Sequence, residues 1–205
     1  VVYGEEKNYD SAKSYFRKAL FIRPDYKPAS KNILKIFRDL NQLDSVTNFL
    51  KGVSLFDPNS ITFINDVGMA FFDQKRYDSA RWYIRKAMLK DSQNPQLYNN
   101  LGLVFQGMKQ YDSARVNMQK ALWLDPENPL FMSNLSGVFR QLKQYDSAAY
   151  YFKKQLLRKG ELNAQAYQDI GNFYTDMKVY DSAIVYYKKV IRLNDRYAAA
   201  YFRTG

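Results

Sequence analysis

The stretch Tyr77-Asp78-Ser79-Ala80 decides the fold of this 205-residue chain, because it recurs at a fixed interval. Four more copies and one related stretch begin at Tyr9, Leu43, Tyr111, Tyr145 and Tyr180. Successive copies are spaced by 34, 34, 34, 34 and 35 residues. A period held this closely is typical of a repeat array, in which each repeat is one supersecondary unit that stacks on its neighbours.

One repeat, residues 95–128, shows two amphipathic helices joined by a short polar break. Apolar residues at steps of three or four mark one face of a first helix: Leu97, Leu101, Phe105 and Met108. The pattern resumes after Lys109-Gln110, at Tyr111, Ala114, Met118 and Ala121. We expect Asp112 or Ser113 to cap this second helix and Asp125-Pro126 to end it, because proline disfavours helix in the residue before it. Each repeat is therefore predicted to be a helical hairpin.

Small and aromatic residues recur in the same register. Glycine inside a helix costs about 1 kcal/mol relative to alanine. Its recurrence therefore predicts close approach of the paired helices at Gly68, Gly102 and Gly171. The second helices carry alanines in phase: Ala80, Ala114, Ala148 and Ala183. The first helices carry aromatic residues in phase, which we interpret as core rather than as a cofactor site: Tyr3, Phe37, Phe71, Phe105, Phe139 and Tyr174.

With these residues the chain resembles the tetratricopeptide repeat family over essentially its whole length. The resemblance is carried by Gly102, Phe105, Ala114, Ala121 and Pro126, and by the phrases Tyr111-Asp112-Ser113-Ala114 and Leu124-Asp125-Pro126. It implies an all-α fold, an α-solenoid of stacked antiparallel helix pairs in a right-handed superhelix. First helices would line a concave groove and second helices would form the convex back. The resemblance also implies an interaction scaffold that binds a protein or peptide partner.

We expect one array to fill residues 1–205. It would comprise a partial repeat at 1–26, full repeats at 27–60, 61–94, 95–128, 129–163 and 164–197, and a partial repeat at 198–205. The cut-off ends suggest a piece of a longer array. In repeat 27–60, Leu34 and Val46 replace small residues, so we expect a splayed helix pair there. The one-residue insertion near Gly160, beyond the expected helix end at Arg158-Lys159-Gly160, is expected to change the superhelical angle.

The composition argues against an enzyme. Histidine and cysteine are absent, which removes the commonest general bases, nucleophiles and zinc ligands. The best carboxylate pairs on one helix, Asp66/Asp73 and Asp169/Asp176, are about 10.5 Å apart, beyond the spacing that paired-carboxylate hydrolases use. We expect no cofactor and no metal. No apolar run approaches the roughly 18 residues of a membrane span. A cytoplasmic and a periplasmic location both stay open, and the composition leans toward a bacterial source.

One polar position next to the core recurs in the first helices and forms the main candidate site. It is occupied by Asn32, Asp66, Asn100, Asn134 and Asp169, at spacings of 34, 34, 34 and 35. An amide both donates and accepts, so a column of amides can pair with an extended peptide backbone. The resemblance implies this asparagine-ladder role for Asn32, Asn100 and Asn134. The two aspartates only accept, which favours peptide N–H groups or basic side chains. The alternative is a row of solvated polar residues.

Further groove candidates surround this position. The polar ones are Asn65, Asn99, Gln168 and Asn172. Met69, Phe72 and Leu103 would either grip a ligand side chain or pack against the adjacent repeat. Lys31, Lys35 and Arg38 form one basic helical face, which matches the carboxylate clamp of some family members only in part. We expect no chaperone binding from it, but a generic acidic ligand end stays open.

The net charge of +11 leaves two alternatives to a peptide groove. Basic residues recur on the second helices, at Arg17-Lys18, Arg85-Lys86, Lys120, Lys153-Lys154 and Lys188-Lys189. They form either a solvated face or a surface for an anionic partner, which would be nucleic acid or an acidic membrane surface. Nucleic acid is disfavoured, because most tyrosines near these residues recur in helical phase and should be packed. The other alternative is a structural or self-assembling module, in which the open repeat ends or the convex face build a larger complex. Exposed repeat ends would also allow a homo-oligomer.

Overall fold

The computed structural model describes residues 9–23, 26–50, 60–157 and 163–193, and these are helices and short connections. The expectations for Val1–Glu6, Asp57-Pro58, Arg158–Gly160 and residues 198–205 lie outside the described residues. The chain divides into two compact units, Val1–Met108 and Lys109–Gly205, here called unit 1 and unit 2. None of the described helices is long and apolar enough to cross a membrane.

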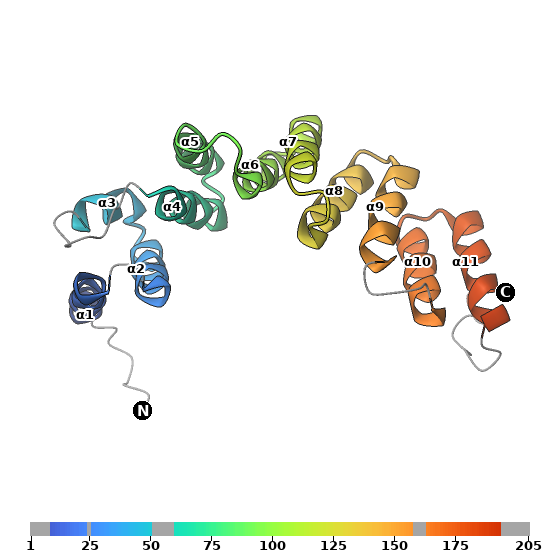
Figure 1. Cartoon of the computed structure of the whole chain (residues 1–205), viewed down its shortest axis with the longest axis horizontal. Coiled ribbons are helices and arrows are strands. Elements are labelled where there is room, and N and C mark those ends of the chain that lie inside the picture. The colour runs from blue at the N-terminus through green and yellow to red at the C-terminus, as the bar shows by residue number, and fades with distance from the viewer. Residues whose placement is uncertain (1–8, 24–25, 51–59, 158–162, 194–205) are drawn as a thin grey trace, which may run out of the picture. The chain divides into compact units, whose positions relative to one another are not determined.

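Unit 1 consists of consecutive helices that pack in pairs (Figure 1). Its elements are α1 (Tyr9–Ile22), α2 (Lys27–Asp39), the 3-10 turn η1 (Leu43–Ser45), α3 (Val46–Phe49), α4 (Ile61–Asp73), α5 (Tyr77–Met88) and α6 (Pro95–Gly107). The hairpin of α4 and α5 is the most extensive pairing. The first helices α2, α4 and α6 also pack side by side in sequence, α2 on α4 and α4 on α6.

Unit 2 continues the same plan of consecutive helices. Its elements are α7 (Tyr111–Leu124), α8 (Pro129–Gln141), α9 (Tyr145–Leu157), α10 (Ala164–Asp176) and α11 (Tyr180–Leu193). The pairs α8–α9 and α10–α11 are hairpins, and α9 packs on α10. The expected all-α hairpin architecture is confirmed, including a helix over residues 9–22.

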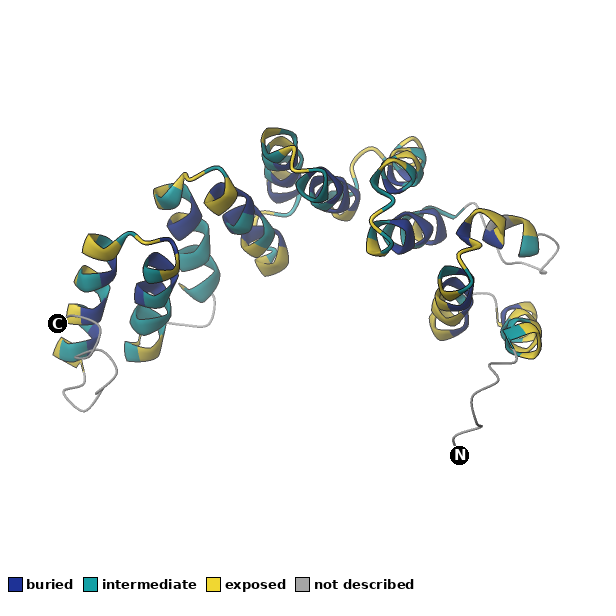
Figure 2. Cartoon of the chain, turned by 180° about the vertical axis from the view of Figure 1, so that it is seen from behind, coloured by how far each residue is buried: buried dark blue, intermediate teal, exposed yellow. Residues whose placement is uncertain are grey.

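The core lies between the helices of each pair, where the buried residues concentrate (Figure 2). The in-phase alanines of the second helices are buried. So are the described in-phase aromatics of the first helices, at most 8% exposed, which confirms their interpretation as core: Phe37, Phe71, Phe105, Phe139 and Tyr174. Ring pairs join the two helices of a hairpin, such as Phe71 on Tyr83 with centroids 5.2 Å apart.

Close approach of the paired helices is confirmed at Gly68 and Gly171, and at Gly102 it stays a prediction. A Cβ added to Gly68 would lie 3.0 Å from Ile84 Cγ1, and one added to Gly171 would lie 2.5 Å from Tyr187 Cε1. Where Ser136 replaces glycine, its hydroxyl donates to the Ala148 carbonyl across the hairpin at 2.8 Å. The serine therefore uses the short distance for a buried hydrogen bond.

The expectation that Asp112 or Ser113 caps the second helix is wrong. Gln110 is the N-cap of α7 and makes no side-chain cap, while Asp112 pairs with Arg115 instead, at 3.4 Å. Side-chain caps occur on first helices, where Ser60, Asn94, Asn128 and Asn163 each accept from a backbone N–H. The second helices α5 and α7 have no side-chain cap and begin directly after the turn that follows the first helix.

That turn ends the first helices α2, α4, α8 and α10 in a Schellman motif. In α4 the N–H of Lys75 donates to Phe72 O at 2.8 Å, and the N–H of Arg76 donates to Phe71 O at 3.0 Å. Lys75 has the left-handed φ of 59°, and the equivalent residues have φ between 56° and 60°: Asn41, Lys109, Lys143 and Lys178. The short polar break predicted between the helices is therefore a fixed backbone geometry that tolerates lysine at a position where glycine is usual.

The divergent repeat 27–60 starts its second half differently. Its chain passes through η1 before the four-residue α3, instead of entering a long helix directly. The bulkier residues Leu34 and Val46 are both buried. Phe37 and Phe49 join α2 and α3 with ring centroids 5.2 Å apart. Whether the pair is splayed along its whole length stays a prediction.

Candidate functional site, a groove between two first helices

The best-defined candidate site is a groove between α2 and α4 in unit 1. The two helices pack side by side and leave a cavity of about 280 Å³. Its walls combine basic, acidic and apolar side chains: Lys31, Leu34, Lys35 and Arg38 from α2, and Asp66, Met69, Ala70 and Asp73 from α4. Five residues of the sequence-based candidate set thus meet in one place, namely Lys31, Lys35, Arg38, Asp66 and Met69.

The charges of this groove are arranged unequally. Arg38 crosses from α2 to α4, where its Nη1 lies 2.9 Å from Asp73 Oδ2, and its carbonyl accepts from Gln74 Nε2 at 3.0 Å. Arg38 is therefore fixed in the wall. Lys31 and Lys35 are exposed, and within the described residues no carboxylate forms an ion pair with either. The basic face predicted from the sequence thus offers two lysines rather than three cations to a ligand.

Asp66 supplies the opposite charge on the α4 wall. Burial raises the pKa of its carboxyl above the ordinary value, while the positive charges of Lys31 and Lys27 and a hydrogen bond with Asn65 oppose that shift of the pKa. A partly desolvated carboxylate gains more than an exposed one from a cation brought by a ligand. The groove therefore presents lysines on one side and an incompletely compensated acid on the other.

The sequence-based candidate set lacks three residues that line the groove, Leu34, Ala70 and Asp73, of which Asp73 is the charged one. The sequence places Asp73 only in a carboxylate pair with Asp66. The signal that could have found it is its position on α4 at the end nearest the loop, where it can meet Arg38 of the preceding first helix. Because Arg38 neutralises Asp73, the pair works as a structural link between α2 and α4.

The asparagine series occupies several different environments. Asn32 is exposed, but it lines a separate cavity of about 420 Å³ between α1 and α2. Asn100 is only 4% exposed. Its Nδ2 donates to Asn65 Oδ1 at 2.8 Å, and its Oδ1 accepts from Gln96 Nε2 at 2.8 Å. The Asn100 amide therefore joins α6 to α4, and Asn99 beside it is fully buried.

The unit 2 members of the candidate set are half-buried, and two of them form hydrogen bonds within their own helix or hairpin. Asp169 Oδ1 accepts from Gln165 Nε2 at 2.9 Å, one turn away on α10. Asn172 Oδ1 accepts from the Tyr187 hydroxyl of α11 at 2.9 Å. Asn134 and Gln168 are half-buried on α8 and α10. Since the series is divided between units 1 and 2, its alignment in a single column stays a prediction.

The apolar candidates also differ from one another. Met69 lines the groove. Phe72 is half-buried and contacts Tyr77 of its own hairpin, with ring centroids 5.8 Å apart, so part of its surface packs within the repeat. Leu103 is half-buried on α6. Met69 is therefore the apolar candidate placed most directly to contact a ligand in the groove.

The basic residues of the second helices interact with aromatic rings of the chain itself. Lys86 Nζ lies 5.3 Å from the centroid of the Trp82 ring, and Lys120 Nζ lies 3.7 Å from that of Trp123. Lys153 and Lys189 both approach the Tyr186 ring, at 4.6 and 4.9 Å. These contacts hold long side chains against the helix surface.

Comparison with known proteins gives a consistent family signal. The family model described as Tetratricopeptide repeat matches residues 1–26, 95–128 and 164–197. No curated protein sequence matches the chain.

Solved structures share the fold at low sequence identity. MamA has 22% identity and a TM-score of 0.56, over 80% of this chain and 95% of that one. PilF of Pseudomonas aeruginosa has 24% identity and a TM-score of 0.57, over 95% and 88%. YrrB, described as a tetratricopeptide repeat protein with an unusual peptide-binding site, has 18% identity and a TM-score of 0.55, over 93% and 97%. At these identities the similarity shows the fold alone.

Proposed function

Because this chain belongs to the tetratricopeptide repeat family, we propose that it is a protein-interaction scaffold that holds an extended partner segment in the groove between α2 and α4. Proteins built from such repeats are generally interaction scaffolds, and the structurally similar YrrB has a peptide-binding site. The observation that carries the proposal is the groove itself, where exposed lysines face a partly buried acid across an apolar floor.

The groove chemistry defines the segment that would fit. Lys31 and Lys35 lie one helical turn apart on α2 and would receive an acidic side chain or the C-terminal carboxylate of a partner chain. Asp66 on α4 would receive a basic side chain or backbone N–H groups. Met69 and Leu34 provide apolar surface between these charges, and a flexible methionine adapts to ligand side chains of different shape. The preferred segment therefore carries both charges and an apolar residue.

The proposal is tested with three labelled peptides that share apolar positions and differ in charge: one mixed, one acidic and one basic. Fluorescence anisotropy with the chain should show the tightest binding for the mixed peptide. A Lys31→Ala/Lys35→Ala variant should weaken it by about two- to thirtyfold, because exposed ionic contacts are each worth about 0.2–1 kcal/mol. Both lysines are exposed, so the fold is expected to persist.

The matched control removes two exposed lysines away from the groove, Lys90 just past the end of α5 and Lys188 on α11, in a Lys90→Ala/Lys188→Ala variant. It has the same net charge as the groove variant and should bind the mixed peptide like the parent chain. Equal weakening by both variants would assign the binding to overall charge. Failure of the parent chain to prefer the mixed peptide would reject the groove as the binding site.

A further inference from the structure

A second surface, distinct from the groove, lies on the side of α5 that faces away from α4. Trp82 and Leu89 are seven residues apart along α5 and its C-terminal end, so they lie on one stripe two turns long. Their side chains are 57% and 89% exposed, although both are large and apolar. Neighbouring exposed apolar side chains of this size are typical of an interaction surface when they adjoin a hollow with an apolar wall.

A hollow adjoins this stripe. It has a volume of about 900 Å³ and is lined by α5 together with Leu101 of α6. Its apolar wall is formed by Trp82, Met88, Leu89 and Leu101. A channel between two adjacent helices has the shape that accepts the side-chain ridge of a third helix.

The anchor residue of the surface is held in place before any partner arrives. The Trp82 ring makes an edge contact with Tyr83, with centroids 4.8 Å apart, and Tyr83 stacks on the core residue Phe71. Lys86 Nζ lies over the Trp82 ring, 5.3 Å from the ring centroid. A tryptophan restrained in this way loses little conformational freedom on binding, which is a property of interface hot spots.

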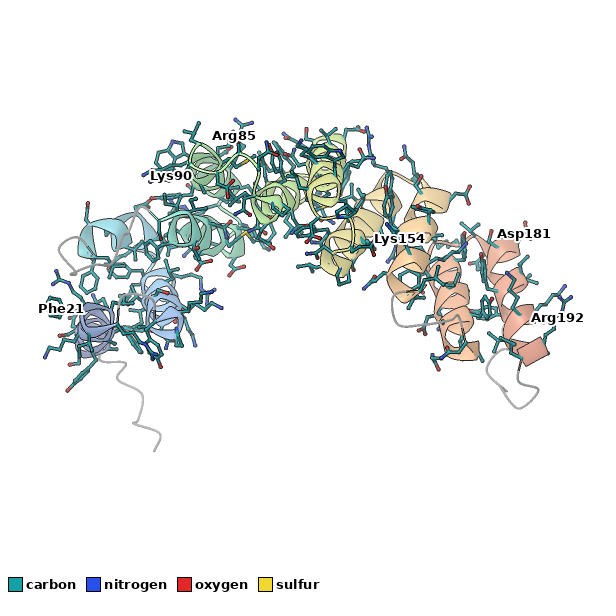
Figure 3. All side chains as sticks on the ribbon, in the orientation of Figure 1. Phe21, Arg85, Lys90, Lys154, Asp181 and Arg192 are labelled. Carbon is teal, nitrogen blue, oxygen red and sulfur yellow. The ribbon has the colours of Figure 1, made fainter. Side chains whose placement is uncertain are left out.

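The rim of the hollow is basic. Arg85 and Lys86 line it, and Lys90 follows Leu89 as an exposed residue. Figure 3 shows Arg85 on the outer side of α5. Arg81 is paired with Asp78 at 2.8 Å, whereas no described carboxylate forms an ion pair with Arg85 or Lys86. The charge that complements this rim is therefore negative.

We propose that the α5–α6 surface, built on Trp82, Leu89 and Arg85, docks an acidic amphipathic helix of a partner protein. Apolar side chains of that helix would enter the hollow, and its flanking glutamate or aspartate residues would meet Arg85 and Lys86. A helical partner fits better than nucleic acid, because the stripe is apolar along its length and the hollow has an apolar wall. This inference does not depend on the α2–α4 groove.

The same register in the other second helices provides a built-in comparison. Trp82 corresponds to Val116, Tyr150 and Val185, and Leu89 corresponds to Trp123, Leu157 and Arg192. On α11, Val185 is 53% exposed, but a cation replaces the second apolar residue of the stripe. Arg85 corresponds there to the exposed Lys188. Substitutions on α11 therefore change a similar surface that lacks the complete stripe.

The test uses a labelled synthetic helix with leucine at positions i, i+3, i+4 and i+7 and glutamate on both flanks, together with a second helix in which lysine replaces each glutamate. The parent chain should bind the acidic helix and not the basic one. Leu89→Gln and Arg85→Glu should each weaken binding about tenfold or more. Val185→Gln and Lys188→Glu should leave it unchanged, and Lys31→Ala/Lys35→Ala should also leave it unchanged.

Three results would overturn the proposal. Equal weakening by Arg85→Glu and Lys188→Glu would show attraction to net charge alone. Binding of phosphatidylserine-containing vesicles, lost in Leu89→Gln, without binding of the acidic helix would assign the surface to a membrane. Sedimentation of the parent chain as a dimer, with Leu89→Gln as a monomer, would assign it to a second copy of the chain. Because Leu89 is almost fully exposed, circular dichroism should show an unchanged fold in that variant.

Discussion

A pair of glycine substitutions tests the packing between first and second helices quantitatively. Gly171 lies inside α10, and a Cβ there would meet Tyr187 at 2.5 Å from Cε1 and 2.8 Å from Cδ1. The Tyr187 ring is 1% exposed. Its hydroxyl donates to Asn172 Oδ1 at 2.9 Å and lies 2.9 Å from Thr175 Oγ1, so the ring has no low-cost direction in which to move.

The expected effect of Gly171→Ala is destabilisation by about 3 kcal/mol. Alanine gains about 1 kcal/mol of helix propensity. Overpacking costs about 1–3 kcal/mol, and displacing Tyr187 weakens two hydrogen bonds of about 0.5–1.5 kcal/mol each. Gly137 provides the control, because a Cβ added there, also inside a helix, meets nothing within 4 Å. Gly137→Ala should therefore stabilise the chain by about 1 kcal/mol.

Urea unfolding followed by far-UV circular dichroism measures both changes, at constant m-value. Stability in a repeat array is a sum of local terms. Amide hydrogen exchange should therefore locate the Gly171→Ala effect in α10 and α11. A Gly171→Ala variant as stable as the parent chain would refute the reasoning, since it would mean that Tyr187 repacks without cost. Destabilisation by Gly137→Ala would refute it equally.

Two further substitutions examine polar groups in the packing. Asp66→Asn should stabilise the chain at pH 7. Burial raises the pKa of the Asp66 carboxyl in the folded state above its value in the unfolded state. The parent chain therefore loses stability as the pH rises through the folded-state pKa, whereas the asparagine variant does not. The difference in free energy of unfolding between variant and parent should vanish below about pH 4, where Asp66 is protonated in both the folded and the unfolded state. A difference that does not depend on pH would contradict this cause. Ser136→Ala should cost about 1 kcal/mol, because it removes the buried 2.8 Å bond to Ala148 O. The control Ser133→Ala removes an exposed hydroxyl from the same helix and should change the urea midpoint little. Equal changes in the midpoint for Ser133→Ala and Ser136→Ala would show that the buried hydrogen bond does not stabilise the chain.

The sequence predicted the core better than it predicted the polar contacts, for a physical reason. Burial of Ala114 and Phe105 follows from helical periodicity within one repeat, which a single sequence displays directly. The hydrogen bond from Asn100 to Asn65 instead depends on how one first helix packs on the preceding one. The residues of that bond are 35 apart, one more than the repeat, so a search along a strict period does not pair them.

The capping error has a related origin. Asp112 and Ser113 are residue types that favour N-caps, but the N-cap position of α7 is Gln110, so both side chains lie inside the first turn of the helix. The register Ser60, Asn94, Asn128 and Asn163 carried the correct signal, one repeat apart and ahead of the first helices α4, α6, α8 and α10. The exposure of Trp82 and Leu89 could also have been predicted from the repeat register. Other residues, such as Ala80, already occupy the core positions of that helix, so these two side chains must lie outside the core.

The left-handed lysines of the hairpin turns give the chain an internal set of protease probes. Lys75, Lys109, Lys143 and Lys178 are all exposed, and each follows the end of a first helix. Trypsin cleaves after lysine only when several neighbouring residues become extended, which a closed Schellman turn prevents. The rate of cleavage at each turn therefore reports how often that hairpin opens. Fragment masses one repeat apart would identify which hairpin opened, and so map local stability along the array without labels or substitutions.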